Sequence, residues 1–89
     1  MFRIRWQRRA LDELTDLWTQ ADSALRQAIT AASHTIDQRL QADPNNEGES
    51  RSRGRRIGFV PPLAVIFRVE ADGQTVSVLQ VRLLGRRGP

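Results

Sequence analysis

The sequence predicts a single α+β domain, residues 1–89, in which a helical hairpin packs on one face of a small, largely antiparallel sheet in the order β-α-α-β-β-β. Two patterns carry this prediction. Apolar and polar residues alternate at the start of the chain and again after residue 54, whereas residues 8–42 place apolar residues at steps of three and four. A chain of 89 residues buries only a little over half of its unfolded surface, so we expect one thin core.

The first strand is predicted over residues 2–6. Its apolar residues alternate with two arginines: Phe2, Ile4 and Trp6 on one side, Arg3 and Arg5 on the other. This is the period-2 pattern of a strand with one apolar and one charged face.

Two helices are predicted next. The first begins near Arg8, and its apolar stripe comprises Leu11, Leu14, Leu17, Trp18 and Ala21. The second is capped by Asp22 or Ser23, and its stripe comprises Leu25, Ala28, Ile29, Ala32, Ile36 and Leu40. The short connection predicts an antiparallel hairpin. A residue before proline is pushed away from the α region, so Asp43 ends the second helix.

The rest of the chain predicts a loop, three strands and a tail. Residues 43–53 are expected to form an exposed loop, because they are almost entirely polar. Strands follow at residues 56–60, 63–70 and 75–84. Pro61-Pro62 marks a sharp connection between the first two, and Asp72-Gly73 is typical of a hairpin turn between the last two. Residues 85–89 are expected to be a basic, frayed tail.

The helices must cover one face of the sheet, since each element has one apolar stripe to bury. We expect the covered face to bear Phe2, Ile4, Trp6, Leu63, Val65, Phe67, Leu79 and Val81. The opposite face then collects Arg3, Arg5, Arg68 and Arg82. The assignment depends on register, because a slip of one residue moves every side chain of a strand to the other face.

The charge distribution predicts an anionic partner. All fourteen basic residues are arginine. Residues 1–50 carry six arginines and eight acids, a net charge of −2, while residues 51–89 carry eight arginines and two acids, a net charge of +6. A basic half is typical of a phosphate-binding surface or of a contact with an acidic protein segment. An ordinary solvated surface is the alternative.

Several classes of protein are disfavoured by composition. The absence of cysteine excludes disulfides and thiolate metal sites, and it favours the cytoplasm. One histidine and scattered acids give no zinc or calcium pattern, and no glycine-rich phosphate loop opens a helix, so neither a metal nor a cofactor is expected. The charged start predicts no signal peptide, and no segment is apolar enough to span a membrane.

The element order, the helical hairpin ended by Asp43-Pro44 and the run GRRIGFVPPLAVIFRVEADGQTVSVLQVRLL (residues 54–84) resemble the RelE/ParE superfamily of bacterial toxins, also called plasmid-stabilisation proteins. The resemblance implies the toxin half of a type II toxin-antitoxin pair, neutralised by a cognate antitoxin protein. RelE-like members cut messenger RNA in the ribosome and ParE-like members poison DNA gyrase, so either target is implied. The oligomeric state stays open.

The positions that RelE-type toxins use are only partly matched. These toxins place basic residues on the first strand after the loop, an arginine entering the next strand, an arginine near the last strand and a tyrosine near the C-terminus. The available matches are Arg55 and Arg56 at the first position, Arg68 near the second, and Arg82, Arg86 or Arg87 at the third. The second position itself is Ala64, and the chain has no tyrosine.

Cleavage of RNA needs a base, an acid and positive charge on the phosphate. For a ribosome-dependent endoribonuclease, the candidates for stabilising the transition state are Arg56, Arg68 and Arg82, and the weak candidates for the base are Glu47 and Glu49. Arginine is a poor proton carrier. Glu70 shares a strand face with Arg68 and is an ion-pair partner or a base. Candidates for binding nucleic acid or antitoxin are Arg3, Arg5, Arg51, Arg53, Arg55, Arg86 and Arg87.

The remaining aromatic and imidazole groups predict structure rather than chemistry. Trp6 and Trp18 are in phase with their apolar stripes, so both are expected in the core. His34 is rotated by roughly 200° from Ala32 and is expected to face water. Three functions stay open: an RNA-cutting toxin, a gyrase-directed toxin, and a non-toxic, non-catalytic nucleic-acid-binding or regulatory module that uses the same arginines. The missing arginine and tyrosine favour binding over cutting.

Overall fold

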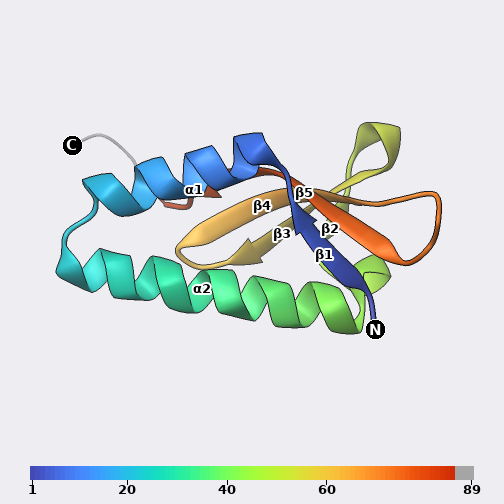
Figure 1. Cartoon of the computed structure of the whole chain (residues 1–89), viewed down its shortest axis with the longest axis horizontal. Coiled ribbons are helices and arrows are strands. Elements are labelled where there is room, and N and C mark those ends of the chain that lie inside the picture. Colours follow the sequence, from blue (N-terminus) through green and yellow to red (C-terminus); the bar gives the residue numbers. More distant parts are fainter. Residues whose placement is uncertain (86–89) are drawn as a thin grey trace.

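A computed structural model describes residues 1–85 as two helices packed on a five-stranded mixed sheet (Figure 1). The predicted α+β fold with a helical hairpin on the sheet is confirmed, and the sheet has one strand more than the four that the sequence predicts. The strands are β1 Arg3–Trp6, β2 Glu49–Ser50, β3 Arg55–Val60, β4 Leu63–Val69 and β5 Thr75–Leu83. The helices are α1 Arg8–Gln20 and α2 Ser23–Ala42, with short 3-10 turns at Pro44–Asn46 and Ser52–Gly54. The helices run antiparallel and are joined at the end of the molecule away from the N-terminus (Figure 1).

The strand order across the sheet is β1-β5-β4-β3-β2. β1 lies at one edge and is parallel to β5, and the other neighbouring pairs are antiparallel. β2 is a two-residue strand inside the segment for which the sequence predicts only an exposed loop. Pro44, at the start of that segment, is buried. The loop is therefore more ordered than its polar composition indicates.

The core lies between the helices and one face of the sheet. Its most deeply buried side chains are Ala10, Ile29, Ala32, Ile36 and Leu40 from the helices and Leu63, Val65, Phe67, Val76, Val78 and Val81 from the strands. Trp6 packs against this cluster, and its Nε1 donates to Asp37 Oδ1 of α2 at 2.7 Å. Asp22 caps α2, since its carboxylate accepts from Leu25 N–H at 2.8 Å.

A bulge in β5 corrects the predicted faces of that strand. Ile66 lies opposite Gln80 and Phe67 lies opposite Val78, which leaves Leu79 as an extra residue. The alternation is therefore shifted by one residue before the bulge. Val76 and Val78 face the helices, where strict alternation with Val81 would put Ser77 and Leu79, while Arg82 keeps the opposite face as predicted.

The prediction that Trp18 lies in the core is wrong. Trp18 is 42% exposed and Leu11 is 45% exposed. The buried stripe of α1 is instead centred on Ala10, with Leu14 and Leu17 packed beside it, so Trp18 lies on the flank. Its Nε1 donates to Thr30 Oγ1 at 3.3 Å. The helix pattern gave the correct period but a phase that is displaced by about one residue.

The structure contains no helix in residues 1–85 that is long and apolar enough to cross a membrane.

Candidate binding face of the sheet

The face of the sheet that the helices leave uncovered, here called the open face, collects arginines from four of the five strands. Strand register places these side chains on it: Arg3, Arg5, Arg55, Ile57, Phe59, Ala64, Ile66, Arg68, Ser77, Gln80 and Arg82. Arg3, Arg5, Arg68 and Arg82 therefore share one face, as the sequence predicts. Arg55 joins them there.

Three of these arginines form one row across the sheet. Arg55 is the register partner of Arg68, Arg68 of Ser77, and Ser77 of Arg5. Because neighbouring strands lie about 4.8 Å apart, this arginine row spans roughly 14 Å between its outer Cα atoms. Arg55 Nε is buried and has no hydrogen-bond partner among the described residues. The row is therefore a line of positive charge whose donors are only partly used.

An acid lies beside the middle of the row. Glu70 Oε2 accepts a hydrogen bond from Ser77 Oγ and lies 3.6 Å from Arg68 Nη2. Ser77 is 1% exposed, so its hydroxyl depends on this carboxylate for a partner. Glu70 therefore acts as an ion-pair partner and hydrogen-bond acceptor, which leaves three arginines against one acid in the row.

The other end of the open face is largely apolar. Phe59 is the register partner of Ala64, and Ala64 of Arg82. Phe59 is 40% exposed, and Ile57 and Ile66 separate it from the arginine row. Ala64, which stands where the resemblance to RelE-type toxins implies an arginine, therefore places a short apolar side chain beside the exposed ring of Phe59.

Arg82 is held by the first helix. Its Nη1 lies 3.0 Å from Glu13 Oε2, and its Nη2 donates to Gln80 Oε1 at 2.7 Å. Glu13 Oε1 also accepts from the Val81 N–H at 2.8 Å. Burial raises the pKa of Glu13, but the hydrogen bond from Val81 and the contacts with Arg82 and Arg9 outweigh it, so this pKa is lowered overall.

Arg56 lies on the helix side of the sheet, away from the open face. Its Nε donates to Glu47 O at 2.9 Å, Nη1 to Ser50 Oγ at 2.8 Å and Nη2 to Gly48 O at 3.2 Å. Gly48 has φ +68°, and a Cβ there would lie 2.0 Å from Ile57 O, so only glycine fits this close approach. Arg56 therefore fixes the loop against β3.

The two glutamates that the sequence offers as bases are both paired. Glu47 lies 3.6 Å from Arg39 of α2, and Glu49 lies 3.1 Å from Arg51. Arg53 is exposed in the same loop. Asp72 lies in the turn that precedes β5. Hydrogen bonds from the Gln74 N–H and from Thr75, together with the charge of Arg3, lower its pKa. Arg86 and Arg87 lie outside the described residues.

Residues 1–85 contain no group of three or more His, Cys, Asp or Glu side chains that could hold a metal ion.

No family model and no curated protein matches the chain by sequence. Solved structures do match. The chromosomal ParDE toxin-antitoxin system from P. aeruginosa matches with a TM-score of 0.75 and 19% identity, over 93% of this chain and 96% of that one. The chain has the RelE/ParE fold. The RelBE2 toxin-antitoxin complex from Mycobacterium tuberculosis matches with a TM-score of 0.71 and 16% identity, over 92% and 96% of the two chains. The isolated E. coli RelE toxin matches with a TM-score of 0.65 and 16% identity, over 98% and 88%.

Within this RelE/ParE fold, sequence reasoning missed two residues of the open face and its border. Strict alternation with Leu79 and Val81 would put Ser77 on the helix side, because a period-2 pattern cannot reveal the bulge at Leu79. Glu13 is an ordinary helix acid in sequence, and its contact with Val81 and Arg82 joins residues 68 and 69 positions apart. Its place on the edge of the apolar stripe of α1 was the one available signal.

Proposed function

We propose that this chain is the toxin of a type II toxin-antitoxin pair, that it arrests growth by binding its target through the open face without cutting RNA, and that an antitoxin protein neutralises it. The proposed target is DNA gyrase engaged with DNA. Support for the toxin role comes from the likeness to the ParDE system and the RelBE complexes over more than nine-tenths of this chain.

The observation that carries the proposal is the absence of a free proton-transfer group beside the arginines of the open face in residues 1–85. Glu70 accepts from Ser77 and pairs with Arg68, and Glu47 pairs with Arg39. The RNA-cutting reaction needs a base and an acid within hydrogen-bond reach of the reacting oxygens. Arginine supplies neither, because its pKa lies above about 12. The open face is better suited to holding phosphates than to cleaving them.

An antitoxin that meets this surface would use opposite charge. The chain carries a net charge of +4, with +6 on residues 51–89, so an acidic segment would be steered toward it. The isolated E. coli RelE toxin and the intact E. coli RelBE complex are both similar to this chain in structure. One fold is therefore known both as an isolated toxin and in a complex with an antitoxin.

Expression of the gene alone from a repressible promoter tests the proposal. We expect growth arrest, relief on co-expression of the neighbouring open reading frame, and inhibition of plasmid supercoiling by gyrase with the purified chain. The double variant Arg5→Ala/Arg68→Ala should lose both effects, while Arg8→Ala on α1 should keep them. Normal growth under strong expression would contradict the toxin role and favour a non-toxic binding module.

A further inference from the structure

The hairpin formed by β2 and β3 projects from the sheet at the end of the molecule opposite the junction of the two helices (Figure 1). Its turn, residues 51–54, is called the hairpin tip below. The tip and the preceding residues 48–50 are all exposed. Residues 49–56 read ESRSRGRR and carry four arginines and one glutamate, a net charge of +3. A positive charge this exposed is typical of a surface that meets phosphates.

The base of the hairpin is fixed, while its tip is free. Arg56 donates to Glu47 O and Gly48 O and to Ser50 Oγ, which holds the start of the hairpin against β3. At the tip, Arg51 pairs with its neighbour Glu49 at 3.1 Å, and no described residue pairs with Arg53. A cation presented on a fixed base needs little reordering of the backbone when it binds a ligand.

The backbone at the tip is unusual for an arginine. The turn is closed by the Arg55 N–H, which donates to Ser52 O, and its two central residues have positive φ, 63° at Arg53 and 72° at Gly54. Tight hairpin turns of this kind favour Asn, Asp or Gly at the first central position. Folding alone therefore favours a residue other than arginine at position 53. A contact outside the chain explains the arginine better.

The hairpin tip adjoins the arginine row of the open face. The Arg51 N–H donates to Arg55 O at 2.7 Å, and Arg55 is the end of the row that continues through Arg68. A ligand that lays its phosphates along the row is therefore met at the end of the row by the tip. The two features form one continuous cationic surface.

The shape and composition of the tip favour duplex DNA over RNA. The major groove of B-form DNA is about 12 Å wide and admits a two-stranded ribbon, whose strands lie about 4.8 Å apart. The major groove of an RNA duplex is too deep and narrow for side chains to read. Single strands are bound by stacking on aromatic side chains, and residues 48–54 contain none.

We propose that the hairpin tip enters the major groove of duplex DNA, with the Arg53 guanidinium on a guanine edge and the arginine row on the neighbouring phosphates. The planar fork of arginine matches the O6 and N7 acceptors that guanine presents in this groove. This inference rests on the proposed function, in which the target is gyrase engaged with DNA. It adds which element of the chain reads that DNA and from which groove.

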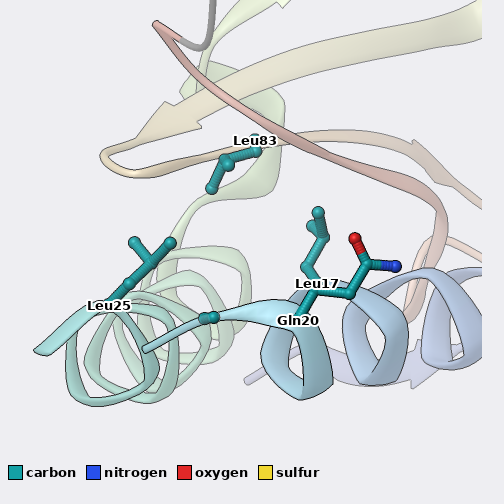
Figure 2. Close-up of a pocket in the computed structure, with 5 residues that line it drawn as sticks. Leu17, Gln20, Leu25 and Leu83 are labelled. Carbon is teal, nitrogen blue, oxygen red and sulfur yellow. The ribbon is translucent and has the colours of Figure 1, made fainter. Parts of the chain in front are cut away.

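The matched variants Arg53→Asn and Gln20→Glu test the contact, because each lowers the net charge by one. Gln20 is exposed at the distant helix junction, where Figure 2 shows it beside an apolar groove whose lining, among the described residues, carries no charged side chain. The probe is a short fluorescein-labelled DNA duplex, titrated with the full chain and followed by anisotropy. We expect Arg53→Asn to weaken binding by about ten-fold and Gln20→Glu by less than about three-fold. The melting temperature of Arg53→Asn should stay the same or rise, because Asn tolerates a positive φ.

Two further probes locate the contact in the groove. Methylation of the duplex at guanine N7, which lies in the major groove, should weaken binding of the wild-type chain and leave the affinity of Arg53→Asn unchanged. An RNA duplex of the same sequence should bind the wild-type chain less tightly than the DNA duplex does.

Failure of this inference and failure of the proposed function look different. Equal affinity of the wild type and Arg53→Asn for the DNA duplex, or equal affinity of the wild type for the DNA and RNA duplexes, overturns the tip contact whatever the growth result. Binding of neither duplex also overturns it and leaves the charge for an acidic protein segment. Absence of growth arrest, with DNA binding that depends on Arg53, overturns the toxin role and keeps the hairpin tip as a DNA-binding element.

Discussion

The two faces of the sheet differ in how far their side chains are buried and in how far their charges are paired. The helix-covered face packs Phe67, Val78 and Val81 at 0–2% exposure. The open face leaves Phe59 at 40% exposure and lines up three arginines with one acid. The covered face is therefore constrained by packing, since any change of volume there costs stability. The open face is not constrained by packing in this way, and we propose that it is constrained mainly by what it binds.

The largest expected difference is between two phenylalanines on opposite faces. Phe67→Ala removes a fully buried ring and should lower the free energy of unfolding by about 3–5 kcal/mol. Phe59→Ala removes a ring that is 40% exposed and should cost less than about 1 kcal/mol. Urea denaturation followed by circular dichroism measures both. Equal losses of unfolding free energy would contradict the difference in burial between the two rings.

The next expected effect separates two glycines with positive φ. Gly73→Ala, in an open turn with φ +70°, should cost about 1 kcal/mol from the left-handed backbone alone. Gly48→Ala should cost at least twice as much, because its Cβ would meet Ile57 O and displace the loop that Arg56 holds. Thermal unfolding of both variants compares them directly. An unchanged melting temperature for Gly48→Ala would contradict the close approach of residue 48 to Ile57 O.

The arginine row should affect binding more than stability. Arg68→Ala should change the unfolding free energy by less than about 1 kcal/mol, because its contact with Glu70 is partly exposed. It should weaken binding to duplex DNA and reduce the salt slope by about one unit. Fluorescence anisotropy at several salt concentrations measures this, with Arg8→Ala as the control. An unchanged salt slope would remove the row from the nucleic-acid surface.

The smallest expected effect concerns pH. The folded-state pKa of Glu13 is lowered, so its contribution to stability is present above the ordinary glutamate pKa of 4.5 and is lost as the pH falls through the lowered value. Glu13→Gln keeps an acceptor for Val81 but removes the charge, so its stability should fall less than that of the wild type between pH 5 and pH 3. The difference should be about 0.5 kcal/mol. Parallel acid-unfolding curves would contradict the Glu13 contact with Arg82.

Local patterns predicted the order of the elements and much of the open face. The alternation around Ile4 placed Arg3 and Arg5 correctly, and Asp22 caps α2 as its position predicts. Non-local geometry could not be predicted in the same way. The bulge at Leu79 depends on how β5 meets β4, and the orientation of Arg56 depends on a loop that closes against β3.

The candidate site was predicted less well than the fold, for a physical reason. Trp18 shows that an apolar stripe gives the period of a helix but not its rotation against the sheet. An arginine in sequence likewise gives its charge, while its partners are set by folding. Arg56 and Arg82 are engaged by protein groups, whereas Arg55 keeps a buried Nε without a partner in the described part of the chain.

Mapping of messenger RNA ends in cells arrested by expression of this chain tests the central claim, binding without cutting, most directly. We expect growth to stop while the distribution of message ends within translated regions stays that of unarrested cells. New ends inside codons of translated messages, appearing with the wild-type chain and disappearing with Arg68→Ala, would contradict this account and make the open face a ribonuclease site.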